Sequence, residues 1–316
     1  MTDGLSMRIR SIAASAAFLL FPMFAGASCG SASCPLDLNS LNRPKAGGFS
    51  LDLSFEYIDQ NRLRGHSDLV PDHTEVRTIN RNATLVLRYA PAEWLQLSVS
   101  TPYVARTHEH LHGDELEHWQ LDGAGDVQLQ ARGRVAPHVW LIGGVKLPTG
   151  ADDKRNAEGE RAEVTIQPGS GSTDVIVGAA FESGVTRQTH VQGSMGNTAF
   201  IPYFASVTYR RNGRGALEHR VGNEWQLNGG TAYPLTRNAE VLLQANVRRR
   251  GRDVSPDDPQ DAFFTGGTYA FLSPGVRYSA GRGALYALMQ LPVLQHVNGI
   301  QLTAKRNWIG GVQLRF

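Results

Sequence analysis

The sequence predicts an all-β protein, a closed antiparallel transmembrane β-barrel of about twelve strands, with ten or fourteen as the alternatives. Three observations predict it: an export signal at the start, apolar residues that alternate with polar ones in segment after segment, and a last strand that ends on an aromatic residue. In hydrocarbon every backbone N–H and C=O needs an internal partner, so an exported chain without apolar helices crosses a membrane only by closing its sheet.

The first segment has the pattern of a cleaved signal peptide. Arg8 and Arg10 give a basic start, an apolar run covers 12–24, and three small residues follow at 25–27. We therefore assign residues 1–27 to the signal peptide, 28–46 to a short periplasmic N-terminal segment and 47–316 to the barrel. This arrangement predicts export to the outer membrane of a Gram-negative cell.

Two cysteines, Cys29 and Cys34, follow the predicted cleavage site, and the chain has no others. An oxidising compartment favours a small local disulfide between them. The alternative is lipidation of Cys29, although Gly26 stands where a lipidation motif usually has Leu.

Composition agrees with a barrel and also with a soluble periplasmic protein. No apolar run after residue 27 reaches the roughly 18 residues that a membrane-spanning helix requires. Mean hydropathy is -0.27, as expected where lipid-facing and lumen-facing residues average out. The formal net charge of +2 argues against nucleic acid as a partner, and no cofactor is expected.

Alternating apolar residues mark the strands in chain order. In the first strand, Phe49, Leu51, Leu53, Phe55 and Tyr57 share one face, and polar residues occupy the other. The pattern returns at 85–89, 95–99, 127–131, 139–147, 175–181, 241–247, 285–293 and 308–316. Less regular segments near 187–211, 217–232 and 264–280 complete the count.

The connections alternate between short and long. Short turns are predicted at 90–93, 133–138, 183–187, 234–238 and 280–283. Long polar segments are predicted at 60–74, 105–118, 148–172, 250–263 and 294–303, with a shorter one at 211–216. Short periplasmic turns and longer external loops are typical of transmembrane barrels.

Aromatic residues near the short turns predict the periplasmic part of an interfacial girdle. The turns within 89–97 and 135–143 each place Pro at the bend and Trp at the start of the next strand. Trp and Tyr suit the membrane interface. The predicted girdle residues are Tyr89, Trp94, Trp140 and Tyr233, and the alternative is ordinary hairpin chemistry in a soluble β protein.

The last strand resembles the C-terminal signature that the barrel-assembly machinery reads in outer-membrane proteins. Its apolar positions include Trp308, Val312, Leu314 and the terminal Phe316, with Gln313 and Arg315 between them. The expected partners are therefore outer-membrane lipid and this machinery.

If the apolar residues face lipid, the polar residues between them line the interior. These candidates for the lining of a pore are Arg88, Gln96, Gln128, Gln130, Arg132, Lys146, Glu224, Gln226, Gln244 and Asn246, followed by Gln313 and Arg315. A lining of mixed charge suits a water-filled or loop-plugged pore. The alternative is a structural barrel whose side chains fill the interior.

One predicted external loop is rich in histidine. His108, His110, His112 and His118 lie among carboxylates, and imidazole and carboxylate groups bind first-row divalent metals. The first three alternate, so they share a face if the strand extends outward. The alternative is a solvated, charged loop.

No enzyme active site is expected, since Ser98, Ser100 and Ser170 lie in no nucleophile motif.

Three stretches in the middle of the chain resemble a known family. They are GAGDVQLQAR at 123–132, GVKLPTGADD at 144–153 and QPGSGSTDVIVGAAF at 167–181. They are similar to the outer-membrane transporter-like β-barrel proteins named after the meta-pathway of phenol degradation. This resemblance implies a channel or facilitator for passive passage of small molecules, including aromatic or hydrophobic compounds, and it supplies no ligand residues. The alternative function is a non-conducting barrel whose histidine-rich loop binds metal or a partner.

Overall fold

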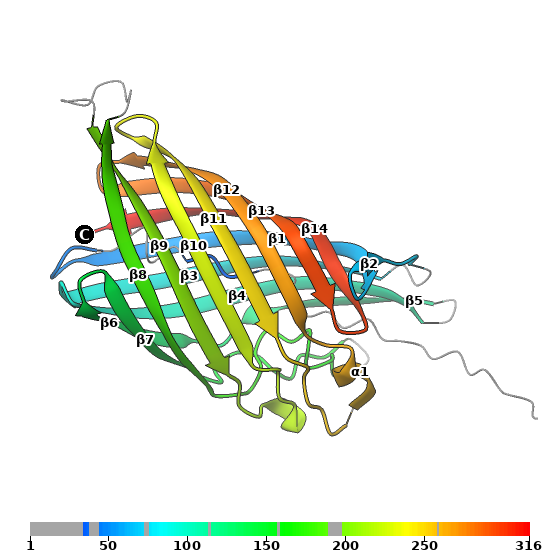
Figure 1. Cartoon of the computed structure of the whole chain (residues 1–316). Helices are drawn as coiled ribbons and strands as arrows, with labels where there is room; N and C mark the ends of the chain where they lie inside the picture. The colour runs from blue at the N-terminus through cyan, green and yellow to red at the C-terminus, as the bar shows by residue number, and fades with distance from the viewer. Residues whose placement is uncertain are drawn as a thin grey trace, which may run out of the picture.

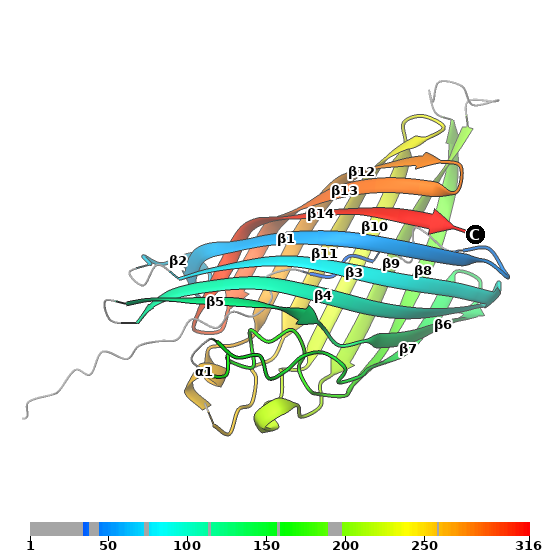
Figure 2. The same ribbon diagram turned by 180° about the vertical axis from the view of Figure 1, so that it is seen from behind.

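Twelve strands form a closed antiparallel barrel in the computed structural model (Figures 1 and 2). The structure describes residues 34–37, 44–72, 76–112, 115–156, 159–188, 198–257 and 259–316. The predicted signal peptide and Cys29 lie outside these ranges. The barrel strands are β1 (Phe49–Gly65), β3 (Arg77–Ala92), β4 (Leu95–His112), β6 (Gln128–Ala136), β7 (Val139–Lys146), β8 (Asp174–Gln188), β9 (Thr198–Arg211), β10 (Glu224–Pro234), β11 (Ala239–Arg250), β12 (Gly267–Ala280), β13 (Gly283–Val297) and β14 (Ile300–Arg315).

The barrel closes where the last strand pairs with the first. Leu53 of β1 lies opposite Val312 of β14, and Phe49 and Phe316 exchange backbone hydrogen bonds of 3.3 and 2.9 Å. Closure leaves no free edge around the twelve strands. The predicted fold class and strand number are confirmed.

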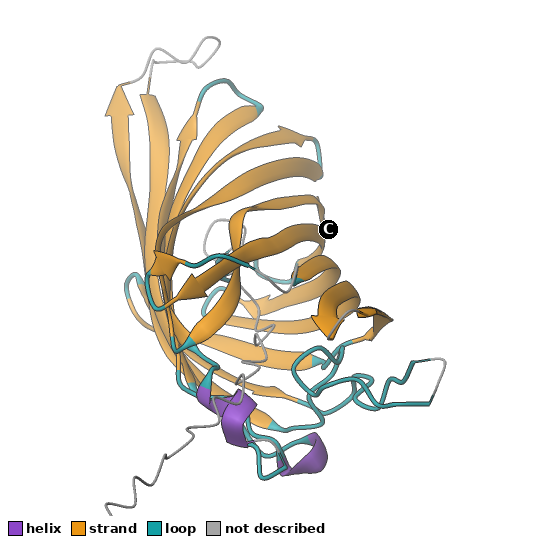
Figure 3. Ribbon diagram, turned by 90° about the vertical axis from the view of Figure 1, so that its right-hand side faces the viewer, coloured by secondary structure: helices purple, strands orange, loops and turns teal. Residues whose placement is uncertain are grey.

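Two short strands and two short helices are additional to the twelve strands of the closed barrel. β2 (Asp68–Leu69) pairs with β1, and β5 (Glu115–Ala124) pairs with β4 alone. The helices are η1 (Ala216–Glu218) and α1 (Pro259–Phe263). Figure 3 shows that the helices and several loops gather at one mouth of the barrel. In the described residues no helix has the length and apolar content needed to span a membrane.

The alternation in the sequence becomes an apolar outside and a polar inside. Phe55 and Leu141 are exposed outward by 56% and 52%, whereas Asp52 and Gln60 of β1 are buried inside the barrel. The terminal signature follows the same rule, with Trp308, Val312, Leu314 and Phe316 on the exposed side. An exterior this apolar indicates a lipid-facing surface.

Several strands extend further than predicted. The predicted long segment at 294–303 consists of strand residues joined by a two-residue turn at 298–299, where Gly299 has φ 67°. The predicted loop at 105–118 is the hairpin of β4 and β5. Backbone pairing continues beyond the apolar belt, where both faces of a strand can be polar, so hydropathy does not mark these strand ends.

The turn predicted at 183–187 is wrong, because those residues lie within β8. Gly184 pairs with Pro202 of β9, and a Cβ at this glycine would lie 2.1 Å from a ring carbon of Phe200. The glycine here therefore makes room for an aromatic ring on the neighbouring strand and does not form a turn.

Three of the predicted girdle residues face outward as expected, whereas the predicted outward position is wrong for Trp140. Tyr89 stacks on Phe49 with ring centroids 4.4 Å apart, and Trp94 and Tyr233 are exposed outward. Trp140 is only 2% exposed and lies near the guanidinium of Arg132, 5.9 Å from its ring centroid. It points inward because the next residue along β7, Leu141, points outward.

Residues 34–37, which the sequence assigned to a periplasmic segment, lie inside the barrel. Cys34 is buried against inward-facing Tyr269 and Phe271, and Asp37 accepts a hydrogen bond from Ser206. An extended peptide is narrow enough to share the interior of a twelve-stranded barrel.

Candidate pore

Two adjoining cavities lie within the barrel. The inner one has a volume of about 380 Å³ and the outer one about 350 Å³. Both are lined by Thr84, Ser100, Gln128 and Arg210, so these residues mark the boundary between them. At this boundary Arg210 Nη2 donates a hydrogen bond of 2.9 Å to Gln128 Oε1.

The predicted lining residues all lie on β-strands at inward-facing positions, except Arg315, which is exposed at the end of β14. Those that line the inner cavity are Arg88, Gln128, Gln130, Arg132, Glu224 and Gln226. Lys146 lines the outer cavity. Gln96, Gln244, Asn246 and Gln313 are buried in the interior but line neither cavity.

Buried ion pairs hold the charged residues of the interior. Arg132 Nη2 lies 2.6 Å from Glu182 Oε1, and Arg248 Nε lies 2.5 Å from Glu224 Oε2. Burial of a charge is costly unless an opposite charge and hydrogen bonds compensate it. Glu182 and Arg248 were absent from the predicted set, although both occupy the inward-facing positions of their strands and that rule alone would have found them.

The three stretches that carry the family resemblance meet at Asp126, between β5 and β6. Its Oδ1 accepts a hydrogen bond of 3.0 Å from the Gly150 backbone N–H. Its Oδ2 accepts hydrogen bonds of 2.7 Å from Lys146 Nζ and 2.6 Å from Ser170 Oγ. Lys146 Nζ also lies 3.0 Å from Asp174 Oδ2. Residues spread over about fifty positions of the sequence thus form one ion-pair network beside the outer cavity.

Three glycines allow the same stretches to pack closely. A Cβ at Gly150 would lie 2.7 Å from the carbonyl carbon of Gly125 and 2.8 Å from the Cα of Gly169. Only glycine permits backbones to approach this closely. The motifs are therefore structural, because they fasten the connection between β7 and β8 to the barrel.

That connection, residues 147–173, covers part of the outer mouth. Ile166 is buried against inward-facing Leu121 of β5 and Leu302 of β14, and Arg106 Nη1 donates to the Thr165 backbone oxygen at 3.1 Å. Leu121 and Leu302 come from separate parts of the wall. The connection therefore reaches across the opening, and Asp126 anchors it close to the end of β7.

We predict that Asp126→Ala releases this connection. Burial alone would raise the pKa of Asp126, but hydrogen bonds from Lys146 and Ser170 outweigh burial and hold that pKa below its ordinary value. Loss of charge-assisted bonds, each of about 1.5–3 kcal/mol, should free the connection locally. Limited proteolysis should cut within 147–173 much faster in the variant. Asp122→Ala is the matched control, because Asp122 is exposed on β5, and equal cleavage in both variants would contradict the prediction.

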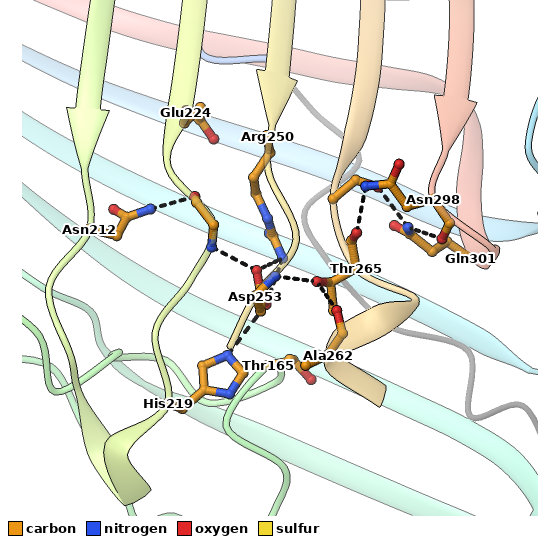
Figure 4. A network of polar contacts seen from close by, with 12 residues as sticks. Thr165, Asn212, His219, Glu224, Arg250, Asp253, Ala262, Thr265, Asn298 and Gln301 are labelled. Carbon is orange, nitrogen blue, oxygen red and sulfur yellow. Dashed lines mark hydrogen bonds and ion pairs between the residues drawn. The ribbon is translucent and has the colours of Figure 1, made fainter. Parts of the chain in front are cut away.

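A second network joins two other external connections around Asp253 (Figure 4). Its carboxylate accepts hydrogen bonds from Arg250 Nη2 at 2.9 Å and from the Gly222 backbone N–H at 2.8 Å, and it lies 3.3 Å from His219 Nε2. Its backbone N–H donates to Thr265 Oγ1 at 2.7 Å. One buried carboxylate thereby links the β9–β10 connection to the β11–β12 connection.

We predict that this link weakens in acid. Burial raises the pKa of Asp253, but the Arg250 charge and the His219 and Gly222 contacts outweigh burial, so its pKa lies below the ordinary value. A depressed folded-state pKa gives stability that is complete above the unfolded pKa of about 4 and is lost as pH falls through the folded value. The hydrogen-exchange protection factor of the Gly222 amide should fall over that range. In Asp253→Asn this protection factor should be low at every pH. A wild-type protection factor that does not change with pH would contradict the prediction.

The histidine-rich stretch is a hairpin, and two of its histidines lie on opposite faces. Register pairs Glu109 with His118 and His108 with Trp119. His108 is buried inside, with Nδ1 2.9 Å from Thr78 Oγ1, whereas His118 Nδ1 lies 3.0 Å from Glu109 Oε1 on the exposed face. The side chains of His110 and His112 lie outside the described part. His118 therefore lies on the other face from His108, and the shared face predicted for His108, His110 and His112 stays a prediction. Within the described residues no three metal-binding side chains cluster.

The predicted Cys29 and Cys34 disulfide involves a residue outside the described ranges and stays a prediction. Cys34 itself is 2% exposed in the barrel interior, and burial raises the pKa of its thiol to about 12. The thiol of Cys34 is therefore a protonated, unreactive group in this position.

Solved structures share this fold, whereas no family model and no curated protein matches the sequence. The COG4313 outer membrane channel from Pseudomonas putida F1 superposes with a TM-score of 0.65 at 12% identity, covering 89% of this chain and 100% of that chain. The transport unit of the autotransporter AIDA-I from Escherichia coli gives a TM-score of 0.50 at 10% identity, covering 89% and 93%. The chain has the fold of outer-membrane β-barrels. At these identities the likeness establishes the fold alone, and the phenol-pathway family is not identified by it.

Proposed function

We propose that this protein is an outer-membrane channel through which small molecules pass passively. The observation that carries the proposal is a closed barrel with an apolar exterior and two adjoining polar cavities inside. Lipid contacts the exterior, and the exposed C-terminal Phe316 fits recognition by the assembly machinery. We include in the proposal export by a cleaved signal peptide and kinship with the phenol meta-pathway proteins.

The inner lining favours permeants with an apolar body and polar groups. Most of its residues are charged or form hydrogen bonds. Apolar side chains from several strands interrupt them, namely Val86, Ile142, Ile176 and Ile309. A purely hydrophobic compound would leave the lining polar groups without water, which costs free energy. Aromatic permeants that bear a polar substituent satisfy both parts of the lining.

Planar bilayers test the proposal directly. Purified protein should give discrete conductance steps, and Arg210→Glu should shift the reversal potential towards cation selectivity, because Arg210 stands where the two cavities meet. Arg211→Glu is the matched control, since Arg211 is the next residue of β9 and is exposed. Absence of conductance from folded protein would overturn the channel proposal.

The second candidate is a non-conducting barrel whose histidine-rich hairpin binds metal or a partner. It is favoured by β5, which pairs with β4 beyond the point where the pairing of β4 with β6 ends and so extends the hairpin past the closed part of the barrel (Figure 2). Zinc titration of the wild type against a His108/His110/His112 triple Ala variant decides it, and equal binding would reject this role.

A further inference from the structure

Residues 34–37 occupy the interior along the wall formed by β9 to β14. Cys34 is buried against Tyr269, Phe271 and Val297, and its backbone oxygen accepts a hydrogen bond of 2.6 Å from Gln290 Nε2. Leu36 packs against the buried cluster that includes Leu242 and Leu288. The segment therefore follows the inner surface of the barrel.

The same segment narrows the inner cavity. Pro35, Leu36 and Asp37 belong to its lining, opposite residues of β3, β4, β6 and β7. The segment has no regular secondary structure, and the contacts that hold it are hydrogen bonds and apolar packing. Contacts of this kind can break without unfolding the barrel, because the strands pair with one another independently of the segment.

Asp37 places a carboxylate at a defined position in the interior. Its Oδ2 accepts a hydrogen bond of 2.9 Å from Ser206 Oγ, and its backbone oxygen accepts one of 3.4 Å from Gln244 Nε2. The same cavity is lined by Arg88, whose buried guanidinium lies 3.9 Å from the carboxylate of Asp52. A hydroxyl donor and a guanidinium are the groups that recognise a carboxylate, so this part of the cavity suits the carboxylate of a small molecule equally well.

We propose that residues 34–37 are a displaceable plug and that a small aromatic carboxylate takes the place of Asp37 when it enters the channel. This inference rests on the proposed function. The carboxylate of the permeant accepts the Ser206 hydrogen bond and faces Arg88. Its ring packs against the apolar side chains that Leu36 contacts before the segment is displaced. A permeant of this class thereby enlarges the passage that it uses.

Cys34 supplies a reporter of plug position. In a Cys29→Ser background it is the only thiol, and a maleimide should modify it slowly while it lies buried. Millimolar benzoate should accelerate the labelling, whereas benzamide, its neutral isostere, should not. Asp37→Asn should accelerate labelling without benzoate by roughly tenfold, the size expected for loss of a charge-assisted hydrogen bond. Asp68→Asn, at an exposed position of β2, is the matched control.

Conductance measurements distinguish failure of the plug inference from failure of the proposed channel function. Asp37→Asn should conduct more than the wild type, and benzoate should raise the wild-type conductance. If the wild type conducts but neither Asp37→Asn nor benzoate alters conductance or Cys34 labelling, the plug inference is overturned and the channel proposal is kept. If benzoate and benzamide accelerate labelling equally, the carboxylate site is overturned. If folded protein of every variant fails to conduct, the proposed function itself is wrong.

Discussion

Replacing Glu182 with Gln is expected to destabilise the folded barrel by about 3–5 kcal/mol. The side chains of Glu182 and Arg132 are 5% and 3% exposed, and Glu182 Oε1 lies 2.6 Å from Arg132 Nη2. Removing the carboxylate charge leaves a buried guanidinium without its close counter-ion. Arg132 borders the inner cavity, but its side chain is only 3% exposed, so little water compensates the charge.

Urea unfolding followed by gel mobility of unboiled samples measures this effect. Glu93→Gln is the control, because Glu93 is 79% exposed and lies 3.8 Å from Arg134, and exposed pairs contribute about 0–1 kcal/mol. A double variant, Arg132→Met with Glu182→Leu, should recover much of the loss, since it removes both charges. Equal stability of Glu182→Gln and Glu93→Gln would show that the pair is not buried in the membrane-embedded protein.

The wall of the barrel was predictable because lipid and lumen impose opposite demands on neighbouring residues. Wherever both demands act, as at Leu53 and Leu141, the period of two appears in the sequence and the structure follows it. Outside the apolar belt both faces meet polar surroundings. The hairpin around Gly299 therefore has no periodic signal, and its sequence predicts a loop.

Trp140 shows that the position of a residue in a strand outweighs its chemical type. An indole suits the membrane interface, which predicted an outward position. The alternation fixed by Val139 and Leu141 places the indole inside, beside Arg132 and Arg134. Applied consistently, the same alternation would also have identified Glu182 and Arg248 as interior charges.

The parts of the candidate pore that escaped prediction depend on contacts between distant segments. Asp126, Lys146 and Ser170 belong to stretches recognised for their resemblance, yet nothing local indicates that they share one network. The position of Cys34 and Asp37 in the interior likewise depends on Gln290 and Ser206, which lie far along the chain. A single sequence contains no local pattern for such pairings.

Replacing Leu129 with Arg should destabilise the barrel by up to about 2–4 kcal/mol, because a cation on the lipid face is costly and the cost is largest at the bilayer midplane. Leu129 of β6 lies between Val99 of β4 and Val145 of β7, and all three belong to the apolar exterior. The next residue, Gln130, lines the inner cavity. Gln130→Arg therefore introduces the same charge on the same strand into polar surroundings, and its stability should stay within about 1 kcal/mol of the wild type.

Refolding into vesicles, followed by chemical denaturation, compares the two variants under one condition. The difference between them depends only on which medium each side chain meets, because backbone, strand and substituted residue are matched. Leu129→Arg should also bring less folded protein into the membrane fraction of cells. If both substitutions cost the same, β6 does not separate lipid from lumen. If Gln130→Arg costs more, the assignment of inside and outside is reversed.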